Sequence, residues 1–397
     1  ELLSNGRNAL SGGKPFSSIT AAQVETDGSW VYGRLNGADI RSEALRDKYA
    51  TLFQQAVLSG SRRVGDRLKL EASAGINQST LNEPERTTVD IDAPNVSGFA
   101  WDFRKNSNVP WLDFGVDVAD PSVFRLDAGS DADGTIHGTW LGRRLVTRTR
   151  LATLKADATW AFNPWFSVKA GIEQRDNDWR NLEYAPLSAP VVLPPGVSLA
   201  DVTRRIGGFG RGLPDVSISD WAAIDLDKLL AVYNIECGCS AVPGAELPAA
   251  PPPREIDERI GAAYVMAAFN WRSGDYGLRG NLGLRATTTH LNASGAATTS
   301  SAGAPQLSVA EAHHYADLLP SFNLRVELPH ALVLRASAAR VLARPEFLQL
   351  APSVTINTTT QTLSVGNPGL DPIRADTLDL QAEWYFARDS LLSAGLF

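Results

Sequence analysis

The feature that most constrains the fold of this sequence is a repeated alternation of apolar and polar residues with a period of two. The alternation is clearest over residues 278–286, 318–328 and 378–386. Because successive side chains of a β-strand point to opposite faces, it predicts strands that have one apolar and one polar face. The polar faces carry side chains that we expect to line a wet lumen, although alternation alone also fits a sheet facing bulk water: Arg279, Asn281, Arg285, Asn323, Arg325, Arg335, Asp379, Gln381 and Glu383.

The connections between the expected strands alternate between short and long. Tight turns fall at residues 61–65, 163–164, 273–275, 329–330 and 387–389. Long connections rich in polar residues, Gly and Pro lie near residues 79–144, 174–256, 291–312 and 344–372. Outer-membrane barrels have short periplasmic turns on one rim and longer extracellular loops on the other. The pattern therefore predicts an all-β fold, an antiparallel transmembrane β-barrel, rather than a soluble sandwich with loops of mixed length at both ends.

Aromatic residues gather beside the short turns. They flank three of these turns, at Trp160, Phe162, Trp165, Phe166, Phe269, Trp271, Tyr276, Trp384, Tyr385 and Phe386. Amphipathic rings are enriched where a membrane meets water, so this placement indicates a membrane interface near the turns. The alternative is that the same rings cap the core of a soluble sheet.

Composition excludes several other classes of protein. The longest unbroken apolar run, residues 262–269, is far shorter than the roughly 18 residues of a transmembrane helix. The formal net charge of −7 argues against a nucleic-acid binder that relies on a basic surface. Cys237 and Cys239, in one Cys-Gly-Cys sequence, fit a local loop disulfide or two free thiols better than a zinc site. We therefore expect no metal and no cofactor.

Motifs of enzyme active sites are absent. The sequence contains no Gly-x-Ser-x-Gly elbow, His-Glu-x-x-His motif or Walker sequence. The glycine cluster at residues 207–212 lacks the dinucleotide-binding spacing, and residues 129–140 fail the calcium-loop pattern at both ends. His313 and His314 are adjacent, so a strand directs them to opposite faces. The sequence therefore predicts that the protein is not an enzyme.

Several segments in the second half of the chain resemble the barrel of TonB-dependent outer-membrane receptors, especially the large alphaproteobacterial and xanthomonad type. Residues 315–325 read YADLLPSFNLR, and LVLR, RP and GNP follow at 332–335, 344–345 and 366–368. Residues 379–386 read DLQAEWYF, and upstream segments read ERIGAAY at 258–264 and RGNLGLR at 279–285. The clear similarity covers residues 258–397.

The resemblance implies a 22-stranded barrel with an N-terminal plug that engages TonB through a short box. It implies a Gram-negative outer membrane, contact with its lipid, and energy from the TonB-ExbB-ExbD complex. No plug, TonB box or signal peptide is recognisable within residues 1–397, and an apolar run continues to Phe397. We therefore expect residues 1–397 to be a partial receptor barrel of roughly 10 to 12 strands, about half of the barrel of a longer chain.

The function expected is TonB-coupled import of a scarce solute, either an oligosaccharide or a ferric siderophore. Two rival functions stay open: a passive, plugless porin, and a secreted β-rich adhesin or carbohydrate-binding module. Aromatic and arginine side chains of the two longest connections are candidates for ligand contact; the alternative is that they pack the loops together or stay solvated. These candidates are Trp101, Trp111, Trp179, Tyr184, Arg204, Arg205, Arg211, Trp221 and Tyr233.

Overall fold

The structure is a computed structural model. It describes residues 17–127, 129, 137–208, 211–212, 218–233, 253–299, 307–352, 354–357 and 362–397. Its strands form one 14-stranded sheet and one two-stranded sheet, which confirms the all-β fold expected from the alternation. Among the described residues, no helix has the length and apolar character needed to cross a bilayer.

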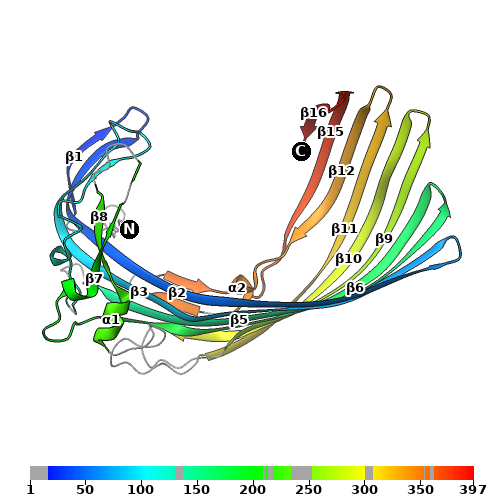
Figure 1. The fold of residues 1–397 in the computed structure, drawn as a ribbon. Helices are drawn as coiled ribbons and strands as arrows, with labels where there is room; N and C mark the ends of the chain where they lie inside the picture. The colour runs from blue at the N-terminus through cyan, green and yellow to red at the C-terminus, as the bar shows by residue number, and fades with distance from the viewer. Residues whose placement is uncertain are drawn as a thin grey trace. The chain divides into compact units, whose positions relative to one another are not determined.

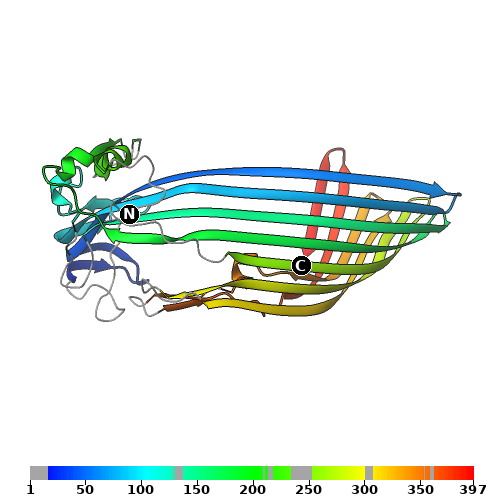
Figure 2. The same ribbon diagram turned by 90° about the horizontal axis from the view of Figure 1, so that it is seen from below.

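Strands that follow one another in the chain lie side by side in the large sheet (Figures 1 and 2). Their order is β1 (Ser18–Val24), β2 (Trp30–Val64), β3 (Leu68–Asp102), β5 (Thr139–Asn163), β6 (Phe166–Pro190), β9 (Arg254–Ser273), β10 (Tyr276–Thr299), β11 (Leu307–Leu328), β12 (Leu332–Ala343), β15 (Ile373–Ala387) and β16 (Ser390–Leu396). This path contains 11 strands, within the 10 to 12 expected.

Shorter elements occupy the long connections. Three more strands pair with the large sheet or with each other: β4 (Trp111–Asp113), β13 (Val354–Asn357) and β14 (Thr362–Val365). The second sheet pairs β7 (Thr203–Gly207) with β8 (Asp220–Ile224). The helical elements are η1 (Pro121–Val123), η2 (Leu199–Val202), α1 (Leu226–Val232) and α2 (Phe347–Leu350).

Tight turns join the hairpins at or near the expected positions, except that the first covers residues 65–67 rather than 61–65, because β2 continues to Val64. Gly65 and Gly274 have φ of +61° and +58°, in the left-handed region that glycine adopts without a steric cost. His330 and Asp389 take similar positive φ values, 64° and 58°, at two further turns. The short turns are thus fixed locally, and they set the register of the strands on either side.

Three of the four long connections are shorter than the sequence suggested. β3 continues to Asp102 and β5 begins at Thr139, so the strands enter the stretch expected to be a loop at 79–144. The strand β6 extends to Pro190 and β10 to Thr299, which likewise shortens the loops expected at 174–256 and 291–312. Only the connection at 344–372 runs, as expected, from the end of one strand to the start of the next. In the extended hairpins, burial on both faces and mixed polarity remove the alternation that marks a two-faced strand.

The described chain divides into two compact units. One unit, here called the loop unit, comprises Glu1–Ala50, Glu83–Leu145 and Glu183–Ala249. The other, here called the sheet unit, comprises Thr51–Asn82, Val146–Leu182 and Ala250–Phe397.

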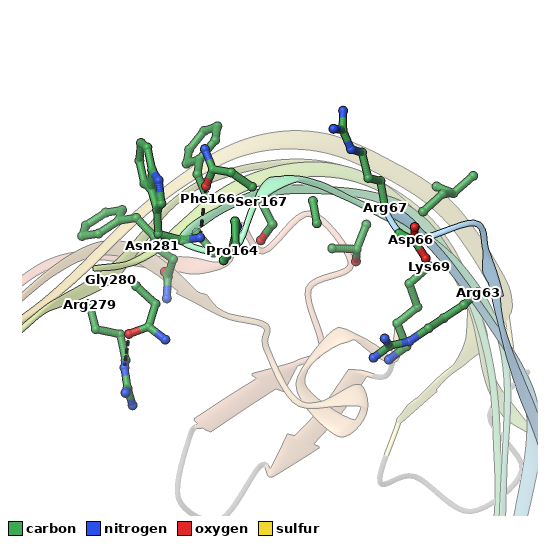
Figure 3. Close-up of a pocket in the computed structure, with 18 residues that line it drawn as sticks. Arg63, Asp66, Arg67, Lys69, Pro164, Phe166, Ser167, Arg279, Gly280 and Asn281 are labelled. Atoms are coloured by element: carbon green, nitrogen blue, oxygen red, sulfur yellow. Dashed lines mark hydrogen bonds between the residues drawn. The ribbon is translucent and has the colours of Figure 1, made fainter. Parts of the chain in front are cut away.

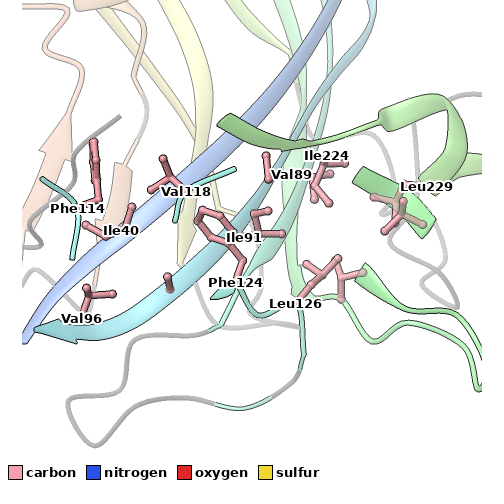
Figure 4. Close-up of a cluster of buried hydrophobic side chains, with 14 of the residues drawn as sticks. Ile40, Val89, Ile91, Val96, Phe114, Val118, Phe124, Leu126, Ile224 and Leu229 are labelled. Atoms are coloured by element: carbon pink, nitrogen blue, oxygen red, sulfur yellow. The ribbon is translucent and has the colours of Figure 1, made fainter. Parts of the chain in front are cut away.

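The loop unit has a hydrophobic core of its own (Figure 4). Ile40, Val89 and Ile91 from the ends of β2 and β3 are fully buried there. Leu229 of α1 is also fully buried, and Ile224 of β8 is 2% exposed. Burial of side chains of this size contributes about 1.5–3 kcal/mol each, so the core can order the long connections.

The sheet unit exposes large apolar side chains on one face of its strands. On β10, Leu282 is 59% exposed, and on the neighbouring β11, Leu318 is 55% exposed. Leu378 of β15 is 57% exposed and projects to the same face, because Leu378 pairs with Ala338, Ala338 with Phe322, and Phe322 with Leu282. A contiguous apolar face of this kind is typical of a surface that contacts lipid.

Candidate functional site

The polar residues of the sheet unit form rows across neighbouring strands. Arg279 on β10 pairs with Arg325 on β11, Arg325 pairs with Arg335 on β12, and Arg335 pairs with Gln381 on β15. The adjacent row is Asn281, Asn323, Ser337 and Asp379. Paired residues of antiparallel strands project to the same face, so both rows share the face opposite the exposed leucines. This surface is here called the polar face.

Hydrogen bonds and ion pairs tie the polar face together. The Asn323 Nδ2 donates to Asn281 Oδ1 at 3.0 Å, and the Ser337 hydroxyl donates to Asp379 Oδ2 at 3.1 Å. The next row toward the short turns adds Glu383, whose carboxylate accepts two hydrogen bonds from Arg335, at 2.8 and 3.2 Å.

Glu327 lies in the same row as Glu383. Its Oε1 is 3.0 Å from Arg325 Nη2, and its Oε2 is 2.7 Å from Arg272 Nη2. The carboxylates of these two glutamates therefore pair with two of the three arginines in the neighbouring row, Arg335 and Arg325.

A hollow of about 490 Å³ opens over these rows. Seven of the nine side chains that the sequence assigned to the polar faces line it: Arg279, Asn281, Asn323, Arg325, Arg335, Asp379 and Gln381. The structure therefore brings together residues from four separate strands. Most of the residues that line the hollow have polar side chains, which suits contact with a polar solute.

A second hollow, of about 560 Å³, lies at the short-turn end of the sheet unit (Figure 3). Arg63, Asp66 and Arg67 of the β2–β3 hairpin line it together with Arg279 and Asn281. Arg279 therefore borders both hollows, and its Nε donates to Asn270 Oδ1 at 3.2 Å. The polar face continues in this way toward the short turns.

Arg285 belongs to a different part of the polar face from the other arginines. Its Nη2 lies 3.0 Å from Glu173 Oε2 on β6, and Glu173 also binds Arg175. Nearby, Lys169 Nζ lies 3.1 Å from Asp157 Oδ2, and the Tyr264 hydroxyl donates to the same carboxylate.

Sequence reasoning did not name Glu173, Lys169, Asp157 or Tyr264. A usable signal was present, since residues 154–162 and 166–173 also alternate, although less clearly than residues 278–286, and the first three occupy polar positions there.

Most of the aromatic candidates for ligand contact are used in packing. Trp101 packs on the loop-unit core, where a Cβ added at Gly33 would lie 2.3 Å from its ring. Trp221 stacks edge-on against Phe114 with ring centroids 5.0 Å apart. The Tyr233 hydroxyl donates to the Val192 carbonyl at 2.6 Å, and burial raises the pKa of this tyrosine. These contacts account for three of the candidates without a ligand.

Trp179 lies on β6 in the sheet unit, not in a loop. It is 8% exposed and packs against Phe347, with ring centroids 6.2 Å apart. A position on a long connection had been expected, and extension of β6 to Pro190 corrects it. Tyr184 falls on the same strand, but its side chain lies outside the described residues, as do Cys237 and Cys239.

The other candidates are accessible in the loop unit. Trp111 is 44% exposed and lines a hollow of about 350 Å³ together with Arg205 and Asp220. Arg205 Nη2 lies 2.7 Å from Asp220 Oδ2, and this hydrogen bond lowers the pKa of the Asp220 carboxyl. Arg204 and Arg211 are exposed but do not line that hollow.

No group of three or more His, Cys, Asp or Glu side chains is placed to hold a metal ion within the described part of the chain.

An antiparallel sheet with an exposed apolar face, a polar opposite face and aromatic residues at its short turns is typical of outer-membrane β-barrel proteins. Within this class the chain belongs to the family described as TonB dependent receptor-like, beta-barrel, whose model matches residues 72–397. The family consists of transport receptors of Gram-negative outer membranes rather than enzymes.

Several solved structures are similar to this chain at low sequence identity and low TM-score. The hemophore receptor HasR of Serratia marcescens, in complex with its hemophore HasA and heme, is 10% identical, with 93% of this chain and 50% of that chain covered and a TM-score of 0.30. The ferric enterobactin receptor PfeA of Pseudomonas aeruginosa is 11% identical, with 89% and 52% covered and a TM-score of 0.28.

The translocator domain of the autotransporter NalP from Neisseria meningitidis is 11% identical, with 91% and 82% covered and a TM-score of 0.23. The chain thus spans about half the length of the two receptors. No curated protein sequence matches it.

Proposed function

We propose that the chain is the barrel portion of a TonB-coupled importer that takes up a scarce solute, either an oligosaccharide or a ferric siderophore. Membership of the receptor-barrel family supports a transport role in the outer membrane. The single observation that carries the proposal furthest is the polar face, where rows of hydrogen-bonding side chains from β10, β11, β12 and β15 stand in register.

The polar face suits passage of a hydrogen-bonding solute. Its arginines are already paired with carboxylates such as Glu383 and Glu327, so the face is close to charge balance. A solute rich in hydroxyl or carboxylate groups can exchange hydrogen bonds with these pairs one at a time. Such exchange holds the solute loosely, which allows it to move on.

Ligand capture in this proposal falls to the loop unit. Trp111 offers an exposed aromatic face, and Arg205 offers a guanidinium that an anionic group could share with Asp220. Energy would come from the TonB-ExbB-ExbD complex, acting through a plug and a TonB box outside this barrel segment.

Uptake measurements in cells with and without TonB test the proposal. Cells that produce the receptor are given radiolabelled ferric siderophore in one arm and labelled oligosaccharide in the other. We expect saturable uptake of one of the two, lost when TonB is deleted. Uptake that is linear in concentration and independent of TonB would instead identify a passive porin, and absence of uptake in both arms would contradict the proposal.

Substitution of Arg335 tests the part played by the polar face. We expect Arg335→Ala to lower uptake by roughly tenfold, the effect of losing about 1.4 kcal/mol from a charge-assisted hydrogen bond. Arg340→Ala is the matched control, because Arg340 lies on the same strand and binds Asp376 on the opposite face, 2.7 Å away. Equal uptake by the two variants would show that Arg335 has no specific role in transport.

A further inference from the structure

The connection between β12 and β15 begins with a segment that crosses the polar face of the sheet unit. Residues 344–352, here called the crossing segment, follow the end of β12 at Ala343 and include α2, which lies over the strands in Figure 1. Arg344 Nη2 reaches Thr289 Oγ1 on β10 at 3.4 Å, and its Nε reaches Glu258 Oε1 on β9 at 3.6 Å. The side chain of the segment's first residue therefore already reaches β10 and β9, beyond the neighbouring strand β11.

Further along, the crossing segment packs on the strand beyond β9. Phe347 contacts Trp179 of β6. Trp179 pairs with Ile256, and Ile256 pairs with Ala293 on β10. Ala293 is an even number of residues from Arg285, so the two side chains project to one face. The crossing segment consequently lies on the polar face and not on the face that exposes leucines.

Apolar packing anchors the segment to the strands. Leu350 and Ala351 are 3% and 0% exposed, and they share a cluster with Ile256 and Leu291. The backbone also approaches closely, because a Cβ added at Gly295 would lie 2.0 Å from the Pro352 carbonyl oxygen. Such close contact is possible only while residue 295 is glycine.

A buried carboxylate adds a polar anchor. The Glu258 side chain is 4% exposed, and its Oε2 accepts a hydrogen bond from Asn177 Nδ2 at 2.7 Å. Arg344 supplies the positive charge beside it. A carboxylate this deeply buried requires a partner of opposite charge, so Arg344 is tied to its position over β9.

The opposite side of the crossing segment is exposed in the part of the chain that the structure describes. Leu348 is 54% exposed and Glu346 is also exposed, whereas Leu350 is buried. The contacts with β10 fall at residues 289–295, beyond the outward apolar stretch at 278–286 and away from the short turns. The segment thus lies at the outer end of the apolar band, on the inner side of the sheet.

We propose that the crossing segment is a fixed internal constriction of the solute path, with Leu348 on the side past which solute moves. This assignment rests on the proposed transport function, since it takes the polar face as the wall of the path. The segment acts as a size filter at the outer end of the membrane-spanning strands. It differs from an extracellular lid, because its anchors are buried on the sheet.

Cysteine labelling in intact cells tests the position of the segment. The receptor is produced with Cys237→Ser and Cys239→Ser, and Leu348→Cys is compared with Val192→Cys, a loop-unit residue that is 58% exposed. A small charged maleimide and a large polyethylene glycol maleimide are applied to both. We expect the Val192→Cys receptor to react with both reagents. The Leu348→Cys receptor should react with the small maleimide but not with the large one.

A second variant tests the anchors. Gly295→Leu places a side chain against Pro352, so it should displace the segment and restore labelling of the Leu348→Cys receptor by the large maleimide. Gly60→Leu is the control, since a Cβ there meets nothing within 4 Å, and it should leave the labelling pattern unchanged.

Labelling of the Leu348→Cys receptor by the large reagent without Gly295→Leu, or by neither reagent, would overturn the constriction. Labelling that Gly295→Leu leaves unchanged would overturn the anchoring. Absence of the protein from the outer membrane would instead contradict the proposed function itself, so the two failures are distinguishable.

Discussion

Two arginines of the polar face form ion pairs with carboxylates. Arg335 binds Glu383, and Arg325 binds Glu327. The two arginine side chains are 39% and 35% exposed, respectively. Ion pairs at this exposure contribute about 0–1 kcal/mol each, so they do not hold the strands together. They keep the polar face hydrated and near neutral, and the strand register comes from the backbone and the turns.

One ion pair of the loop unit makes a prediction about pH. The Arg104 guanidinium binds the Asp102 carboxylate, with Nη2 and Oδ2 2.6 Å apart, and holds the pKa of that carboxyl at about 2, against an ordinary value of 3.8. A lowered pKa means that ionised Asp102 stabilises the fold. The contribution is complete above pH 3.8 and is lost as the pH falls through about 2.

We expect protection of the Phe103 amide, which donates to the Val31 carbonyl at 2.8 Å, to weaken over that range. Amide hydrogen exchange, corrected for the intrinsic rate at each pH, measures it. Arg104→Ala should remove this pH dependence. The same acid-dependent loss in the variant, or a loss confined to higher pH, would contradict the assignment.

At the scale of the element, β15 shows how one strand serves two environments. Leu378 projects toward the apolar face, and its neighbour Thr377 projects toward the polar face, where its hydroxyl donates to the Ala339 carbonyl. Leu378 belongs to the row that contains Leu282, in the middle of the outward apolar stretch. Adjacent residues therefore meet lipid and water in turn.

This arrangement predicts opposite outcomes for the same substitution at adjacent positions. Leu378→Arg should reduce folding in the membrane by about 2–4 kcal/mol, the cost of an arginine on the lipid face near the midplane. Thr377→Arg should cost little, because Asp379 lies on the same face two residues along the strand. Refolding into lipid vesicles measures the free energy of folding of both variants. An equal loss in the two variants would show that the two faces of the strand meet the same environment.

Much of the strand pattern could be predicted because polar and apolar environments alternate residue by residue. This is why β10, β11, β12 and β15 were recognised, and why most of their polar side chains were found in one hollow. The outer parts of β2 and β3 were missed, since Val89, Asp90, Ile91 and Asp92 are all buried and show no period of two. A strand covered on both faces has no alternation to detect.

The crossing segment could not be predicted for a different reason. Its anchors, among them Trp179, Glu258 and Leu350, lie up to 171 residues apart in the chain, and each looks ordinary in its local sequence. Only the pairing of β6, β9 and β10 brings them together. The same applies to Arg285, which the sequence grouped with the other arginines but which binds Glu173 two strands away.

For the whole molecule, the exposed apolar face of the sheet unit determines where the protein can be stable. Its large exposed side chains include Leu154, Ile172, Val265, Leu282, Leu318 and Leu378. At about 25 cal/mol per Å² of apolar surface, leaving such a face in water is costly, whereas lipid removes the cost.

We therefore expect the protein to stay in the outer-membrane fraction through a high-salt wash and to be released only by detergent. On gels it should migrate differently before and after heating, because a folded barrel resists detergent until it is heated. A soluble secreted adhesin would behave in the opposite way, remaining in solution without detergent and showing no heat-dependent shift.

The order of the strands has a consequence for assembly. From β9 to β12 every strand pairs with the one synthesised just before it, and β9 to β10 and β11 to β12 need only a tight turn between them. Closing a loop costs conformational entropy that rises slowly with length, by about 0.6 kcal/mol for each doubling. The barrel wall can thus grow one hairpin at a time, each new edge serving as the template for the next strand.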